Sequence, residues 1–100
     1  VGAIDALKAS DLSREEWPVV VGIDGTNVGL EAVKNGEMVG TVYNDKEGQA
    51  KGMLELSFAL ATGGNLEDLN LEDLDLENGK YIRLPYTKVG PDDVDEYLDR

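Results

Sequence analysis

Two short runs of mostly β-branched residues constrain the fold of this chain more than any other feature. They occupy residues 19–24 and 39–44, and enough residues for one amphipathic helix lie between them. Strand–helix–strand patterns over about thirty residues are typical of a βαβ unit, and near-continuous apolar strands are typical of a buried parallel sheet. The sequence therefore predicts an α/β fold in which these two strands run parallel and are buried.

A polar residue ends each predicted strand: Asp24 closes the first and Asn44 closes the second. In open α/β sheets the ligand crevice lies outside the carboxyl ends of the strands. We therefore take Asp24 and Asn44 as the candidate ligand-binding residues. Two structural alternatives remain open at this point: Asp24 next to Gly25 could cap the following turn, and Asn44 with Asp45 could form a capping pair.

The composition excludes several kinds of chemistry. The 100 residues include 21 acidic and 9 basic side chains, and the net charge of −12 argues against binding to nucleic acid or to an anionic membrane. The chain has no cysteine and no histidine, which removes cysteine nucleophiles, Ser-His-Asp triads and the usual zinc sites. No stretch approaches the ~18 apolar residues of a membrane span. We expect a protein that is not an enzyme, with no catalytic residue, metal or cofactor.

Apolar periodicity and capping residues predict the remaining elements. Thr26 or Asn27 can cap a helix after the first strand, and Asp45 can cap a longer helix after the second. Pro85 lacks a backbone N–H and confines the last strand to an edge or half-exposed position. The predicted elements are helices at about 1–10, 27–35, 46–62 and 91–98, parallel strands at about 19–24 and 39–44, and a strand at about 80–86.

The first predicted helix has no N-cap and no acidic first turn, although its apolar spacing is already established at Ile4 and Leu7. A helix whose start lies upstream of Val1 explains this pattern, and a natural N-terminus that frays for one turn is the alternative. The first interpretation predicts that the chain is a piece of a longer protein.

The helix predicted at 46–62 carries an apolar stripe, and the aromatic residues of the chain are assigned to packing rather than to ligand stacking. The stripe consists of Ala50, Met53, Leu54, Ser57, Phe58 and Ala61. The aromatic residues assigned to packing are Trp17, Tyr43, Phe58, Tyr81 and Tyr86. Arg83 is expected to stabilise the fold rather than to contact a ligand.

Residues 65–79 repeat the pattern Asn-Leu-Glu-Asp-Leu and are rich in acidic side chains. Fewer than two complete units cannot stack the core of a leucine-rich repeat. A calcium loop that starts at Asp73 is disfavoured, because its glycine stands at the seventh position and Leu84 stands where a bidentate glutamate belongs. An acidic surface loop or a short irregular helix is expected.

Five segments of the sequence, in this order, carry a family resemblance. They are GAIDALKA at 2–9, VVGID at 20–24, AVKNG at 32–36, GTVYNDKEGQA at 40–50 and RLPY at 83–86. Together they resemble the C-terminal third of the galactose/glucose-binding proteins, the sugar-capturing components of bacterial ABC importers. The match runs nearly end to end; its most specific parts are the segments 40–50 and 83–86, and its weakest part is the loop 65–78.

The resemblance implies the type I periplasmic-binding-protein fold, in which two doubly wound α/β lobes joined by three hinge segments close on a sugar. Asp24 matches the family's carboxylate that accepts hydrogen bonds from sugar hydroxyls, and Asn44 matches an amide that both donates and accepts. Residues 1–45 and 80–100 would form part of the C-terminal sugar-binding lobe. Residues 46–79 would be a hinge-crossing helix and acidic loop that pack on the N-terminal lobe. No metal site can be carried over.

The function implied by the resemblance is non-covalent binding of D-glucose or D-galactose for ABC-type import or chemotaxis. The expected partners are the hexose, the remainder of the binding protein and an ABC permease, and the expected location is extracytoplasmic, in the periplasm or lipid-anchored at the cell surface. An effector-binding domain of a sugar-responsive transcriptional repressor with the same fold is the first alternative. An enzyme or structural fragment that shares only the fold is the second.

Overall fold

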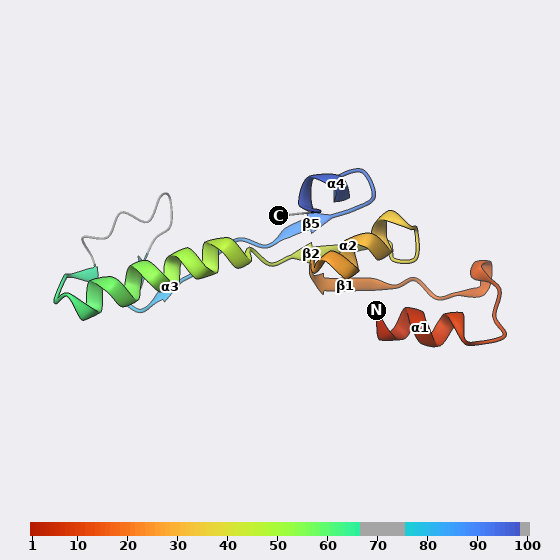
Figure 1. Cartoon of the computed structure of the whole chain (residues 1–100), viewed down its shortest axis with the longest axis horizontal. Coiled ribbons are helices and arrows are strands. Elements are labelled where there is room, and N and C mark those ends of the chain that lie inside the picture. Colours follow the sequence, from red (N-terminus) through yellow and green to blue (C-terminus); the bar gives the residue numbers. More distant parts are fainter. Residues whose placement is uncertain (67–75, 99–100) are drawn as a thin grey trace. The chain divides into compact units, whose positions relative to one another are not determined.

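The computed structural model describes residues 1–66 and 76–98, and the chain divides into two compact units (Figure 1). The first unit comprises Val1–Asn44 and Tyr86–Arg100, and the second comprises Asp45–Pro85. The strands at the candidate binding residues belong to the first unit. We describe each unit by itself.

The first unit is a mixed α/β fold built on a three-stranded sheet. Its elements are α1 (Gly2–Lys8), the 3-10 helix η1 (Arg14–Glu16), β1 (Val21–Asp24), α2 (Asn27–Lys34), β2 (Gly40–Tyr43), β5 (Thr87–Val89) and α4 (Val94–Tyr97). The strand order is β1-β2-β5. β1 and β2 pair in parallel and are connected through α2, so the predicted strand–helix–strand arrangement is confirmed.

Helix α2 begins and ends where its sequence signals lie. The Thr26 Oγ1 accepts a hydrogen bond from the Gly29 N–H at 3.2 Å, which satisfies one of the free donors of the first turn. The helix ends at Asn35 and Gly36, and Gly36 has a φ of 76°, a conformation that favours glycine. Of the two predicted caps, Thr26 is the one used, and the helix ends within one residue of the predicted end at 35.

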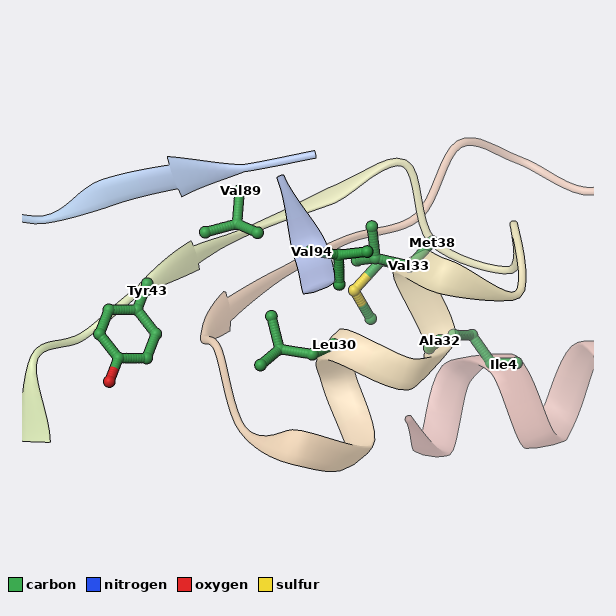
Figure 2. Packing of buried hydrophobic residues seen from close by; sticks show 8 residues of the cluster. All are labelled: Ile4, Leu30, Ala32, Val33, Met38, Tyr43, Val89 and Val94. Atoms are coloured by element: carbon green, nitrogen blue, oxygen red, sulfur yellow. The ribbon is translucent and has the colours of Figure 1, made fainter. Parts of the chain in front are cut away.

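The hydrophobic core of the first unit lies between α2 and the sheet, with α1 and α4 contributing one residue each (Figure 2). Helix α2 supplies three of the core side chains: Leu30 and Val33, three residues apart, share one face, and Ala32 lies on a different side of the helix. The buried cluster consists of Ile4, Leu30, Ala32, Val33, Met38, Tyr43, Val89 and Val94.

Strand β1 is covered on one face only, which corrects the expectation of a buried strand. Val21 and Ile23 are 70% and 73% exposed, whereas Val20 packs against the core cluster and Gly22 is half-buried. Successive side chains of a strand point to opposite faces, so one helix-covered face buries only every second residue. β1 also lies at the edge of the sheet in the described part of the chain.

The C-terminal part of the first unit differs from the sequence prediction in two places. Residues 87–89 form β5, which pairs antiparallel with β2 and was not predicted. The helix predicted at 91–98 is shorter and covers Val94–Tyr97, because residues 91–93 form a turn. The Asp93 N–H donates to the Gly90 carbonyl at 3.1 Å, which closes that turn before the helix begins.

The second unit contains α3 (Lys46–Ala61) and a two-stranded antiparallel sheet of β3 (Leu76–Glu77) and β4 (Tyr81–Ile82). The Asp45 Oδ1 accepts a hydrogen bond from the Gly48 N–H at 3.0 Å, so the predicted cap of α3 is confirmed. The strand predicted at 80–86 is wrong in extent: only residues 81–82 are in a strand, and no ladder continues to Pro85, which has no N–H to donate.

Two aromatic residues assigned to packing, Tyr81 and Tyr86, are exposed instead. Phe58 is also exposed, but it belongs to the apolar stripe that was expected to pack on a lobe outside this chain. Tyr81 lies beneath the guanidinium of Arg83, whose Cζ is 5.6 Å from the ring centre, and the Arg83 Nε contacts the Glu77 Oε2 at 2.7 Å. These contacts hold the exposed Arg83 side chain across the β3–β4 hairpin, and its stabilising role stays a prediction. Most of the acidic repeat at 65–79, with the disfavoured calcium loop from Asp73, lies outside the described residues.

A core prediction follows from the burial of α2. Replacing Leu30, which is 0% exposed, by alanine should lower the free energy of unfolding by about 2–5 kcal/mol, because it leaves a cavity against the sheet. Val28→Ala is the matched control on the same helix: Val28 is 56% exposed, and its loss should cost less than about 1 kcal/mol. Urea denaturation followed by circular dichroism measures both. Equal losses would show that α2 is not packed as described.

Candidate functional site

The two candidate binding residues are neighbours at the carboxyl ends of β1 and β2. The parallel register pairs Asp24 with Tyr43, and Asn44 is the next residue along the chain. The Asn44 N–H donates to the Asp24 carbonyl at 3.1 Å, so one backbone hydrogen bond joins the two residues. Two residues that are 20 positions apart in the sequence are thus held side by side at the carboxyl ends of the strands.

The Asp24 side chain is exposed, and no hydrogen bond or ion pair holds its carboxylate within the part of the chain that the structure describes. Its backbone has a φ of 88°, in the left-handed region, and Gly25 follows with a φ of 65°. Asparagine and aspartate tolerate this region better than other non-glycine residues, at a cost in free energy. The Asp24–Gly25 pair is a local sequence signal for such a turn.

The helix caps next to these residues come from other side chains. Thr26 is the N-cap of α2, and Asp45 is the N-cap of α3. Asp24 and Asn44 therefore each precede an N-cap rather than serve as one. Asn44 is half-buried, and Asp24 is exposed.

The aromatic residues close to the sheet pack in the core. Tyr43 is 5% exposed and belongs to the buried cluster, as predicted. Trp17 is half-buried against the same cluster, and the Arg14 guanidinium lies 4.5 Å from its ring centre. Both assignments to packing are confirmed.

A carboxylate and a primary amide at adjacent strand ends provide acceptors and donors for a ligand with several hydroxyl groups. Ionised carboxylates only accept hydrogen bonds, whereas an amide does both. Among residues 1–66 and 76–98, no group of three or more acidic side chains is arranged to hold a metal ion. The helices in these ranges are too short and too polar to cross a bilayer.

The free energy of unfolding shows whether the Asp24 carboxylate caps the turn or is free to bind a ligand. Thr26→Ala should lower the free energy of unfolding by about 1 kcal/mol, because the Gly29 N–H loses its partner. Asp24→Gly should change the free energy of unfolding by less than about 0.5 kcal/mol, because no side-chain hydrogen bond is lost and glycine accepts a φ of 88°. A loss for Asp24→Gly as large as that for Thr26→Ala would instead indicate that the carboxylate caps the turn.

The sequence of this chain is similar to those of known binding proteins. No family model matches the chain. Over 96 residues, 96% of the chain, it is 30% identical to the D-galactose/methyl-galactoside binding periplasmic protein MglB of Haemophilus influenzae. Over 67 residues, 67% of the chain, it is 39% identical to a candidate rhizopine-binding protein of Rhizobium meliloti.

The chain spans about 28% of the length of the galactose-binding relative, and the match to the second relative spans about 21% of that protein. Both relatives are described as binding proteins, not as enzymes. The small sheet with its parallel β1–β2 pair is consistent with part of a periplasmic-binding-protein lobe. Over nearly its whole length, this chain is therefore homologous to part of the galactose-binding periplasmic protein.

Proposed function

We propose that this chain supplies two hydrogen-bonding groups, the Asp24 carboxylate and the Asn44 amide, to the sugar site of an extracytoplasmic binding protein. The ligand is a monosaccharide of the glucose or galactose type, and the bound protein delivers it to an ABC permease. Binding is non-covalent, and closure of two lobes on the sugar is the signal passed on. The whole activity belongs to a protein longer than this chain.

The observation that carries the proposal is the hydrogen bond of 3.1 Å between the Asn44 N–H and the Asp24 carbonyl. It keeps the two residues adjacent at the carboxyl ends of parallel strands, where open α/β sheets bind ligands. The exposed Asp24 carboxylate has no hydrogen-bond partner within the described ranges. It therefore remains available to a ligand.

Sugar chemistry fits this pair. Neighbouring hydroxyls of a pyranose each donate and accept, and planar carboxylate and amide groups can meet two hydroxyls at once. A hydroxyl of the wrong configuration would leave one of these groups unpaired in a closed cleft. Such a group costs about 1–3 kcal/mol, which is enough to discriminate between epimers.

The relatives support the ligand class and the location. One is described as binding D-galactose and methyl-galactoside in the periplasm, and the other as a candidate for binding rhizopine. We infer a periplasmic or surface-anchored protein on this basis. We also propose that residues 46–79 pack on the second lobe of the longer protein, which would cover the exposed Met53, Leu54 and Phe58 of α3.

The role of Asp24 can be tested in the full-length protein with D-galactose, methyl-galactoside and D-glucose as ligands. Asp24→Gly and Asp24→Ala should each weaken binding at least tenfold, about 1.4 kcal/mol, because the hydroxyl acceptor is lost. The glycine variant removes the carboxylate without adding strain at φ 88°. Isothermal titration calorimetry measures the dissociation constants.

Asp11→Ala is the control for that experiment, because Asp11 is also an exposed carboxylate but lies in the connector before β1. It should leave the dissociation constants unchanged. Unchanged affinity in both Asp24 variants would remove Asp24 from the site. A full-length protein that binds none of the three sugars would refute the assigned ligand class.

The proposed covering of α3 predicts that the 100-residue chain associates with itself when produced alone, because exposed apolar side chains drive association. Leu54→Ser combined with Phe58→Ser, on one face of α3, should reduce that association. Glu47→Ser on the same helix is the control and should not. Analytical ultracentrifugation distinguishes these outcomes. A strictly monomeric parent chain would contradict the covering of this face.

A further inference from the structure

We propose that Tyr43 is a positioning residue: its buried ring supports the Asp24–Gly25 turn and thereby sets where the Asp24 carboxylate is presented. This inference rests on the proposed function, in which that carboxylate binds sugar. Tyr43 itself does not touch the ligand. Tyr97 packs on the Tyr43 ring and holds it in place.

At the end of β1 the left-handed conformation carries strain at Asp24, whereas glycine accepts it without strain at position 25. Asp24 and Gly25 have φ angles of 88° and 65°, both in the left-handed region. An L-residue persists there only when the surrounding structure imposes the conformation. The contacts of the turn must therefore supply that constraint.

The turn packs directly on Tyr43. Gly25 is buried, and a Cβ built on it would lie 2.8 Å from the Tyr43 Cδ2 and 3.0 Å from the Tyr43 Cα. No side chain fits between them. The parallel register places Asp24 opposite Tyr43, and the Asn44 N–H holds the Asp24 carbonyl at 3.1 Å. Two contacts therefore hold the turn: the hydrogen bond to the Asp24 carbonyl and the packing of Gly25 on Tyr43.

A residue of the C-terminal helix α4, Tyr97, packs on the Tyr43 ring. It is 5% exposed, and its centre lies 4.9 Å from that of Tyr97 with the planes inclined by 54°, a favourable tilted aromatic pair. Tyr97 belongs to α4, which is anchored by Val94, 1% exposed in the core. Figure 2 shows Tyr43 at one end of the cluster with its hydroxyl pointing away from the aliphatic side chains. The ring is therefore the supporting group, and the hydroxyl is not required.

The experiment measures sugar affinity in the full-length protein for Tyr43→Phe, Tyr43→Leu and Tyr97→Leu. Tyr43→Phe keeps the ring and should bind within about twofold of the parent. Tyr43→Leu and Tyr97→Leu should weaken binding at least about threefold, because a carboxylate that is no longer held in place binds less well. Circular dichroism and denaturation establish that each variant is folded. If Tyr43→Leu does not fold, Tyr97→Leu decides the question, since it leaves Tyr43 itself in place and removes the aromatic partner of its ring.

A double-mutant cycle separates positioning from general stability. In an Asp24→Gly background, the leucine variants should cause less than about twofold further loss of affinity, because no carboxylate remains to be positioned. A role in stability alone would give the same loss with and without Asp24. That additive result would overturn the inference.

Hydrogen exchange of the Asn44 amide gives a readout that does not depend on sugar binding. The amide should exchange at least about tenfold faster in Tyr43→Leu and in Tyr97→Leu than in Tyr43→Phe, because its acceptor, the Asp24 carbonyl, loses its support. Unchanged exchange would refute the positioning role. If sugar affinity is unchanged in Asp24→Gly while the exchange rates follow this pattern, the proposed function fails and the structural coupling stands.

Discussion

The parallel pairing of β1 with β2 is the interaction on which the candidate site depends. It places two strand ends side by side, and the Asn44 N–H bonded to the Asp24 carbonyl is its last rung. Parallel strands require a crossover that returns the chain to the same starting edge. Helix α2 is that crossover, and its buried Leu30 and Val33 hold it against the sheet. If Leu30 and Val33 were not buried, few contacts would keep β1 and β2 in this register.

The sequence was informative wherever local pattern and capping chemistry agreed with the tertiary structure. The β-branched runs, the caps at Thr26 and Asp45, and the stop at Gly36 are local signals, and the structure uses all of them. From these signals alone, the parallel strands could be assigned and their polar ends placed together. The assignment of Asp24 and Asn44 as ligand groups remains a proposal, because it concerns a partner that the chain does not contain.

Features that depend on long-range contacts were not predictable. Strand β5 consists of Thr87, Lys88 and Val89, which is too short a segment to show a period, and it exists because β2 offers an open edge. Tyr43 and Tyr81 were both assigned to packing, yet Tyr43 is buried and Tyr81 is exposed. Residue type cannot tell which helix or strand has a neighbour to cover it. The same holds for β1, where the alternate exposure of Val21 and Ile23 reflects an absence of cover in the described chain.

The charge of the chain is compatible with a neutral ligand and unfavourable for an anionic one. With a net charge of −12, long-range attraction would favour cations and repel phosphates or carboxylates. A neutral sugar experiences no such steering, so its recognition depends on hydrogen bonds of correct geometry rather than on charge. Geometry of that kind needs a rigid support for the groups that make it. The exposed Asp24 has that support through Gly25 packed on the buried Tyr43. A flexible carboxylate at the same strand end would bind water and sugar hydroxyls with little discrimination.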